Sequence, residues 1–373
     1  MDIIPFFKLM VDRSASDIFF SVGAPPCMKV EGITAPIGHN LIKSQQMVEI
    51  AKSIMSDAQQ KEFEETLELN MAISLEGIGR YRINLFRQRG EVAMVIRYIK
   101  GDIPSIESLQ LPSILKSVVM EQRGLVLVVG ATSSGKSTTL AAMIDYRNSN
   151  HFGHILTIED PIEYLHQHKK SIVDQREVGI DTLSYDSALK NAMREAPDVI
   201  MIGEIRDRNT MKHGIAYAET GHLCLSTLHA NNSNQTMDRV LNFFPEEARQ
   251  QLLLDMSLNL RAIISLRLVP GLNNQRVPAV EVLLNTPYIS DLIEKGKVDE
   301  IKEVMSRSVE QGMQTFDTAL FDLYKAGKIS KENAIEYADS KNNVGLKIRL
   351  SEEGSLDDGG DLKIDSEDLD KLK

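Results

Sequence analysis

A turn of small residues followed by one lysine lies between a short apolar run and a segment of helical spacing. Residues 126–140 read VLVVGATSSGKSTTL, and they contain the full pattern G-x-x-x-x-G-K-[ST]. The two glycines of this pattern let successive backbone N–H groups point at phosphate oxygens, and the following helix adds the positive end of its dipole. Lys136 supplies a cation for the β- and γ-phosphates, and the Ser137 hydroxyl is a ligand for Mg²⁺. We therefore expect a site for ATP and Mg²⁺ made of Gly130, Ala131, Thr132, Ser133, Ser134, Gly135, Lys136, Ser137 and Thr138.

Acidic residues follow two further apolar runs, where strands of a parallel sheet would end. One run reads VIMIGE and resembles a Walker B motif, so we expect Glu204 to face the magnesium ion. The other reads ILTIEDPIE and ends in three carboxylates, Glu159, Asp160 and Glu163. Carboxylates repel a triphosphate unless a cation lies between them, so their position predicts metal binding or activation of water. The residue types leave open which of the three is the general base.

Two histidines bracket the apolar run LCLSTL. His222 precedes the run and His229 follows it, so the two imidazoles emerge at opposite ends of one strand. A neutral imidazole there could sense a γ-phosphate, contact a neighbouring subunit, or serve the fold alone. The spacing does not decide among these roles.

The second half of the chain has the pattern of an α/β sheet. Continuous apolar runs separated by helix-length stretches suit parallel strands that are covered on both faces. Beyond Pro245 the spacing predicts mostly helices, from EEARQQLLLDMSLNLRAII to about Ala338, with one strand at VPAVEVLL. The expected parallel strands are Leu125–Val129, Ile155–Ile158, Val199–Ile202 and Leu223–Ser226.

The first hundred residues predict a separate α+β domain. SDIFFSVG and CMKVEG have strand patterns, and residues 44–65 have helical spacing. LNMAISLE, RYRINLFR and EVAMVIRYI then predict an antiparallel meander, because glycines occupy the turns between them. The expected organisation is an N-terminal domain, a linker with two prolines, a second domain and an acidic tail, at residues 1–100, 101–113, 114–345 and 346–373.

Composition narrows the class of protein. Two cysteines far apart exclude a tetracysteine metal site and fit a reducing compartment. No run reaches the ~18 apolar residues of a membrane span, and MDIIPFFKLM is a poor signal peptide, so we expect a cytoplasmic protein. Residues 351–373 carry nine acids and three lysines, which is −6 of the net charge of −11, so we expect them to be disordered.

Four segments in this order resemble the boxes of the secretion ATPase superfamily. They are the phosphate loop, HILTIEDPIEY, REAPDVIMIGEIRD and TGHLCLSTLHA, which resemble the Walker A, aspartate, Walker B and histidine boxes. SDIFFSVGAPPCMKVEG and the strands RYRIN and VIRYI extend the resemblance to the type IV pilus retraction ATPases of the PilT/PilU family. The weak AIRNLI-like match at 290–297 and the acidic extension resemble its accessory, PilU-like branch.

The resemblance implies a hexameric ring of protomers with a PAS-like N-terminal domain and a RecA-like P-loop ATPase domain. It implies ATP hydrolysis in the cytoplasm at the inner-membrane base of the pilus machine, for pilus retraction and twitching motility. The implied partners are further copies in a homo-hexamer, a PilT-like retraction ATPase and the inner-membrane platform protein.

The resemblance also implies roles for single residues. Glu163 would be the general base, Glu204 would serve the metal site, and His222 and His229 would relay the nucleotide state. Arg82 and Arg97 would act as arginine fingers, with Arg80 and Arg87 as further candidates. Arg80 and Arg82 alternate along a strand and so share one face of the sheet.

The residues alone are also compatible with other functions. One is an ATP-binding adaptor that strengthens a PilT-like motor without motor activity of its own. Another is a type II secretion ATPase or a DNA-translocating RecA-like ATPase. The acidic balance and the lack of tryptophan disfavour a nucleic-acid partner, which usually needs a basic groove and stacking aromatic side chains.

Overall fold

The computed structural model of the chain describes residues 3–30, 32–75, 77–99, 101–273, 275–308 and 312–354. Helices and strands are interspersed along it, so the predicted α/β class is confirmed. The chain divides into two compact units, which are described separately. The first comprises Met1–Leu109, Leu115–Leu125 and Ser137–Thr227, and the second comprises Gln110–Ile114, Val126–Lys136 and Leu228–Lys373.

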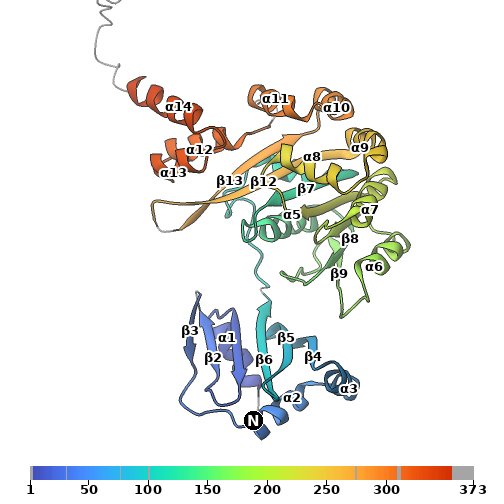
Figure 1. The fold of residues 1–373 in the computed structure, drawn as a ribbon, viewed down its shortest axis with the longest axis vertical. Coiled ribbons are helices and arrows are strands. Elements are labelled where there is room, and N and C mark those ends of the chain that lie inside the picture. The colour runs from blue at the N-terminus through green and yellow to red at the C-terminus, as the bar shows by residue number, and fades with distance from the viewer. Residues whose placement is uncertain are drawn as a thin grey trace, which may run out of the picture. The chain divides into compact units, whose positions relative to one another are not determined.

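Six strands of the first unit form an antiparallel sheet in the order β3-β2-β1-β6-β5-β4 (Figure 1). The predicted meander is confirmed, because β5 pairs with both β4 and β6. Strand β3 is an addition to the predicted strands. The bounds are β1 (Asp17–Ser21), β2 (Cys27–Val30), β3 (Ile33–Pro36), β4 (Glu68–Leu75), β5 (Gly79–Gln88) and β6 (Glu91–Ile99).

Three helices accompany this sheet, and two features of them differ from the prediction. The apolar N-terminal segment forms α1 (Ile4–Asp12), because its proline lies in the first turn, where no backbone N–H is needed. The single helix predicted over 44–65 is two helices, α2 (Ser44–Ile54) and α3 (Asp57–Thr66). Met55 is the C-cap of the first, and Ser56 caps the second, since its side chain accepts a hydrogen bond from the backbone N–H of Gln59.

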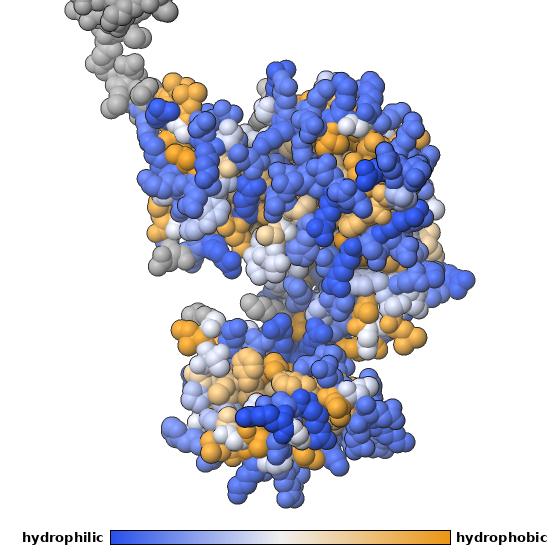
Figure 2. Space-filling model, in the orientation of Figure 1, coloured by the Kyte–Doolittle hydropathy of each residue, from blue (hydrophilic) through white to orange (hydrophobic). Residues whose placement is uncertain are grey.

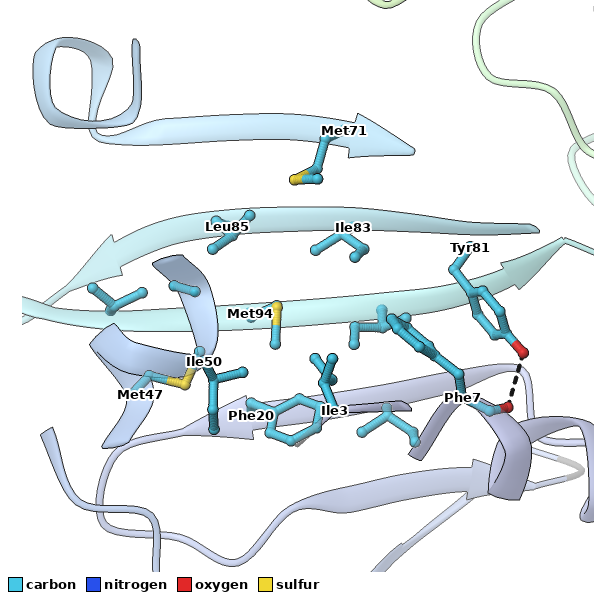
Figure 3. Packing of buried hydrophobic residues seen from close by; sticks show 14 of the residues in the cluster. Ile3, Phe7, Phe20, Met47, Ile50, Met71, Tyr81, Ile83, Leu85 and Met94 are labelled. Atoms are coloured by element: carbon cyan, nitrogen blue, oxygen red, sulfur yellow. Dashed lines mark hydrogen bonds between the residues drawn. The ribbon is translucent and has the colours of Figure 1, made fainter. Parts of the chain in front are cut away.

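The core of this region lies between the sheet and its helices (Figure 3). Phe7 of α1 stacks on Tyr81 of β5 with ring centroids 4.4 Å apart, and Tyr81 Oη donates a hydrogen bond to the Phe7 carbonyl at 2.8 Å. Burial raises the pKa of Tyr81 to about 12, so its hydroxyl stays a donor at physiological pH. Helix α1 is therefore fixed to the sheet by both packing and a hydrogen bond.

Seven further strands form a second sheet in the order β13-β12-β7-β11-β10-β8-β9. In the first unit, β8 pairs in parallel with β9 and β10, and β10 with β11, which confirms the parallel pairing predicted from the apolar runs. In the second unit, β12 and β13 are antiparallel. The bounds are β7 (Gly124–Gly130), β8 (Gly153–Glu159), β9 (Ser171–Glu177), β10 (Val199–Ile202), β11 (Leu223–Leu228), β12 (Leu260–Pro270) and β13 (Arg276–Leu284).

Two of these strands differ from the prediction. Strand β9 was not predicted, because its polar and apolar residues do not alternate cleanly. The helix predicted to run through LRAII is wrong there: α9 (Glu246–Asn259) ends and β12 begins at Leu260. Ile263 and Ile264 are completely buried in β12, so pairing with β13 overrides the local helical spacing.

The predicted series of short helices past Pro245 is confirmed. Figure 1 shows α10 to α14 following one another at the C-terminal end of the second unit. Short 3₁₀ turns occupy Met193–Glu195 and Val298–Glu300. The helices are α4 (Ile114–Val119), α5 (Lys136–Asn150), α6 (Tyr185–Ala192), α7 (Arg208–Glu219), α8 (Ser233–Asn242), α10 (Pro287–Glu294), α11 (Ile301–Arg307), α12 (Phe316–Lys325), α13 (Lys331–Glu336) and α14 (Lys341–Gly354).

Helix α14 extends past the predicted start of the acidic tail at residue 346. Val344 and Ile348, one turn apart, are completely buried in a cluster with Phe316 and Leu320 of α12. This packing keeps the chain helical to Gly354. Residues 355–373, which carry most of the predicted tail, lie outside the described residues.

The visible surface is mostly hydrophilic, with apolar side chains in small separate patches (Figure 2). Within the described ranges, no helix combines the length and apolar character needed to cross a membrane.

Candidate nucleotide site

The predicted phosphate loop joins the end of β7 to the start of α5. Gly130 is the last residue of the strand, and Lys136 is the first residue of the helix. Ser133 and Gly135 have positive φ angles of 61° and 96°, which turn the backbone into a compact loop. Lys136 Nζ donates hydrogen bonds to the carbonyl oxygens of Gly130 and Ala131, at 3.0 and 2.8 Å. The lysine side chain therefore lies against the loop. An anion bound by the N–H groups of the loop would lie close to its ammonium group.

Two features of the loop fit a phosphate group. A Cβ at Gly130 would lie 2.3 Å from Ser134 Oγ and 2.7 Å from the Leu266 carbonyl oxygen, so only glycine allows this close approach. Ser134 Oγ is buried and has no hydrogen-bond partner in the part of the chain that the structure describes. A buried hydroxyl without a partner costs about 1–3 kcal/mol, which a phosphate oxygen would relieve.

The donors that Mg²⁺ prefers are also present. Ser137 lies in the first turn of α5 and offers a hydroxyl oxygen, and Glu204 follows β10 and offers a carboxylate. Over the described residues, no group of three His, Cys, Asp or Glu side chains is placed to hold a metal ion. Mg²⁺ keeps several waters and binds through one or two protein groups plus phosphates, so it does not need such a group.

In the second unit, the phosphate loop and His229 line one cavity. Its volume is about 760 Å³, and its polar walls include Thr132, His229, Gln235 and Arg239. His222 lies before β11 and His229 after it, as the sequence predicts. His222 Nδ1 is 3.1 Å from Thr220 Oγ1, a contact within its own turn.

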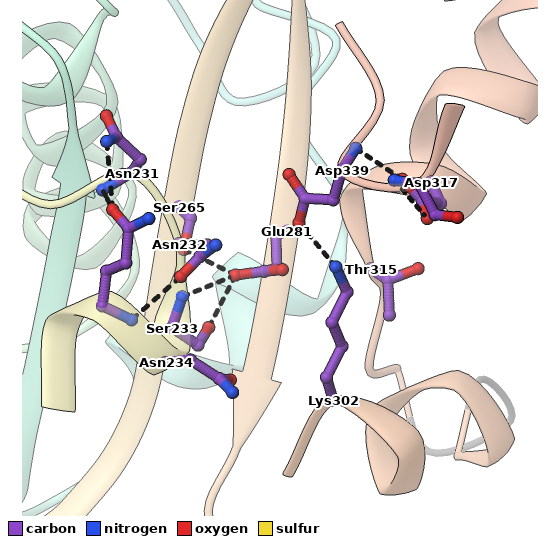
Figure 4. Close-up of polar contacts among 12 residues, drawn as sticks. Asn231, Asn232, Ser233, Asn234, Ser265, Glu281, Lys302, Thr315, Asp317 and Asp339 are labelled. Carbon is purple, nitrogen blue, oxygen red and sulfur yellow. Dashed lines mark hydrogen bonds and ion pairs between the residues drawn. The ribbon is translucent and has the colours of Figure 1, made fainter. Parts of the chain in front are cut away.

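The segment after His229 is fixed by a buried carboxylate that no motif identifies (Figure 4). Glu281 of β13 is 2% exposed and accepts hydrogen bonds from the Ser233 N–H, the Ser233 hydroxyl and the Ser265 hydroxyl, at 2.7, 2.8 and 3.0 Å. Burial raises the pKa of Glu281 despite these three donors. Glu281 therefore holds the start of α8, the helix that brings Gln235 and Arg239 to the cavity.

In the first unit, Glu159 at the end of β8 is 8% exposed. Its Oε1 accepts hydrogen bonds from Thr157 Oγ1 at 2.7 Å and from Gln175 Nε2 at 3.2 Å. The backbone N–H of Glu163 donates to the same carboxylate. Burial raises the pKa of Glu159 to about 7, although these donors favour its ionised form. The Glu163 side chain, in contrast, is exposed.

We expect Glu159→Gln to become more stable relative to the wild type as the pH rises. The pKa of Glu159 is about 7 in the folded chain and about 4.5 without the fold, so between these values the native state holds a proton that the unfolded chain releases. The wild-type free energy of unfolding thus loses up to about 3 kcal/mol from this group between pH 4.5 and 7, and glutamine does not titrate. Urea unfolding of both proteins at pH 5 and pH 8 measures the effect. An equal difference in stability at both pH values would contradict it.

Arg206 connects Glu204 to Asp160. The sequence motifs predicted no role for this arginine. Arg206 Nε donates to Glu204 Oε2 at 2.8 Å, and Arg206 Nη1 lies 3.5 Å from Asp160 Oδ2. The acids follow β10 and β8, which are parallel neighbours, so the structure brings them together as expected. Charged partners raise the pKa of Arg206, Glu204 being the strongest. The GEIRD sequence places this arginine two residues after Glu204, which was the available signal.

The predicted arginine fingers have carboxylate partners in this structure. Arg82 and Arg97 are opposite one another in the register of β5 and β6. Arg97 Nε donates to Asp17 Oδ1 at 2.7 Å. Arg82 Nε and Arg80 Nη2 each lie 3.9 Å from an oxygen of Glu177, a buried residue of β9. Burial raises the pKa of Glu177, and the two guanidinium groups oppose that rise.

Comparison with known proteins agrees with this geometry. Residues 10–312 match the family described as type II/IV secretion system protein. The type IV pilus ATPase PilU of Pseudomonas aeruginosa is 52% identical over 358 residues, which cover 96% of this chain and 94% of that protein. The PilT retraction ATPase of the same organism is 41% identical over 338 residues, which cover 91% of this chain and 98% of PilT.

Two solved structures of ATPases are also similar to this chain. The pilus retraction motor PilT with bound ADP has a TM-score of 0.85 at 39% identity and covers 92% of this chain and 98% of its own. The ATPase DotB of Legionella pneumophila has a TM-score of 0.72 at 26% identity, over 88% and 94% of the two chains. The chain therefore belongs to the type II/IV secretion system protein family, in the group that contains the pilus ATPases PilT and PilU.

Proposed function

We propose that this chain hydrolyses ATP as the PilU-like accessory retraction ATPase of a type IV pilus machine. The observation that carries the proposal is the phosphate loop, where Gly130 leaves no room for a side chain and the buried Ser134 hydroxyl has no partner within the described residues. The likeness to PilU, and to a PilT structure with bound ADP, supports a nucleotide as the ligand.

The chemistry follows from the side chains of the site. Backbone N–H groups and the Ser134 hydroxyl would bind the phosphates, and Lys136 would neutralise the charge that develops on the transferred phosphoryl group. Glu163 is exposed and accessible to water, so we assign it as the general base that orients and deprotonates the attacking water. Bound Mg²⁺ would supply further charge neutralisation, with Ser137 and Glu204 as its protein ligands.

A cavity in the first unit is a candidate site for the adenine base. It has a volume of about 520 Å³ and is lined by Val11, Tyr98, Pro104 and Tyr164, among others. Apolar and aromatic walls of this kind suit a planar base. Tyr164 Oη is 3.0 Å from Thr138 Oγ1, in the first turn of the helix that follows the phosphate loop. Tyr164 thus connects this cavity to the first turn of α5.

The assembly belongs to the proposal as well. We expect a homo-hexamer of protomers with an N-terminal domain (1–100), a linker (101–113) and an ATPase domain (114–345), on the cytoplasmic side of the inner-membrane pilus base. In such a ring Arg82 or Arg97 would reach the γ-phosphate after leaving its carboxylate partner, and His222 and His229 would relay the nucleotide state. Its partners would be a PilT-like retraction ATPase and the platform protein of the machine.

Phosphate release by the purified chain, alone and with a PilT ring from the same source, tests this function. We expect ATP turnover that requires Mg²⁺ and is either present alone or induced by the PilT ring. A chain that binds ATP but never hydrolyses it under either condition would instead favour the adaptor role. Light scattering with and without ATP follows the assembly, and a strict monomer in both states would contradict coupling between subunits.

A further inference from the structure

The segment that joins β8 to β9 carries Glu163, and side chains of neighbouring elements bind its backbone at several points. Hydrolysis requires the base to be held within a fraction of an ångström, because a misplacement of about 1 Å can cost about 100-fold in rate. The residues that hold this segment in place therefore affect the rate of the proposed hydrolysis.

Gln175 of β9 binds the backbone of this segment at two residues, Tyr164 and His166. Gln175 Nε2 donates a hydrogen bond to the Tyr164 carbonyl oxygen at 2.9 Å, and Gln175 Oε1 accepts one from the His166 N–H at 2.8 Å. Tyr164 is the residue directly after Glu163. A single side chain thus fixes the backbone immediately beyond the proposed base.

Gln175 also fixes the segment from its other end, through Glu159. Gln175 Nε2 donates a second hydrogen bond, to Glu159 Oε1 at 3.2 Å. The Glu159 carboxylate in turn accepts the backbone N–H of Glu163. The amide of Gln175 is therefore connected to the Glu163 N–H through Glu159 and binds the backbone directly at Tyr164 and His166.

The amide nitrogen and the amide oxygen of Gln175 both take part in hydrogen bonds. A primary amide has two N–H donors and one carbonyl acceptor, and here both donors and the acceptor have partners on this segment or on Glu159. Glutamate at this position would lose both donors and would place a carboxylate against Glu159. Leucine, of similar size, would lose all three hydrogen bonds.

The neighbouring strand residue acts on the same segment. Glu177 is two residues further along β9, so it lies on the same face as Gln175. Its Oε2 accepts the Ile162 N–H at 3.4 Å, one residue before Glu163. Strand β9 thus presents a row of polar groups to the backbone that carries the base.

We propose that Gln175 is a positioning residue that holds Glu163 in its working position by binding the backbone after it, at Tyr164 and His166, and the Glu159 side chain before it. The inference rests on the proposed ATP hydrolysis and deepens it, because it says what makes the base effective. Gln175 acts through the backbone and Glu159, and it needs no contact with the nucleotide.

Steady-state kinetics of Gln175→Leu and Gln175→Glu in the full chain test the proposal. Phosphate release is measured in the assembly state in which the wild type turns over, and affinity is measured with a fluorescent ATP analogue. We expect kcat to fall about 10- to 100-fold in both variants, with KM and the analogue Kd within about 3-fold of the wild type. This split distinguishes positioning of the base from general damage to the nucleotide site.

The matched control is Gln60→Leu, which removes a glutamine hydrogen bond to the Met55 carbonyl oxygen, 3.3 Å long, in the N-terminal helices. We expect its kcat and KM to equal those of the wild type. Circular dichroism shows whether Gln175→Leu folds, and if it does not, the nearly isosteric Gln175→Glu decides.

Two results would overturn the proposal. One is a kcat within 2-fold of the wild type in a folded Gln175 variant, and the other is a Kd that rises in proportion to the loss of kcat. If the wild type itself never hydrolyses ATP, the proposed function fails instead, so the two failures are distinguishable.

Discussion

Replacing Glu163 with glutamine should leave ATP binding intact and lower turnover by about 10²- to 10⁴-fold. Glutamine keeps the size of the side chain but cannot take the proton of the attacking water. The backbone N–H that donates to Glu159 is unchanged by the substitution, so the segment should keep its conformation. Phosphate release and fluorescent-nucleotide binding, measured on the same protein samples, check both halves of the expectation.

Normal phosphate release by Glu163→Gln would contradict the assignment of the base. Glu159 is then the less suitable replacement, although its pKa of about 7 suits a base, because it is 8% exposed and its carboxylate already accepts three hydrogen bonds. Asp160, which is exposed and lies 3.5 Å from Arg206 Nη1, would be the next candidate.

Replacing Lys136 with alanine should weaken ATP binding by roughly 30- to 1,000-fold and abolish turnover. The expected loss is about 2–4 kcal/mol, the range for one or two charge-assisted hydrogen bonds. Lys136 Nζ also bonds the carbonyl oxygens of Gly130 and Ala131, so the variant loses part of the loop's internal support. The measurement is equilibrium binding of magnesium-ATP by calorimetry.

Lys190→Ala is the matched control for this variant, because Lys190 pairs with Asp186 on an exposed helix face and we expect no change in binding. In cells, Lys136→Ala should remove the contribution of this chain to pilus retraction. Twitching motility that persists unchanged would favour the adaptor role, in which the chain strengthens a PilT-like motor without hydrolysing ATP.

The sequence predicted those parts of the fold and site that depend on local pattern. Continuous apolar runs predicted β8, β10 and β11 because strands covered on both faces must be apolar throughout. The phosphate-loop motif predicted the strand-to-helix turn at Gly130 and Lys136, because its backbone geometry needs those residue types.

The rest depends on contacts between residues distant in the chain. Strand β12 is set by its pairing with β13, and its own spacing suggests a helix. Gln175 lies in no motif named above, and Arg206 lies in the GEIRD sequence without a predicted role. Their contacts arise because β9 and β10 lie on either side of β8. The end of α14 depends likewise on the burial of Val344 and Ile348.

The central claim is that the backbone loop ending at Lys136 binds a triphosphate. Calorimetric titration of the purified chain with ATP and Mg²⁺, alone and with a PilT ring, tests it most directly. We predict saturable binding by the wild type that Lys136→Ala weakens and Lys190→Ala leaves unchanged. Absence of binding by the wild type in every assembly state would contradict the account.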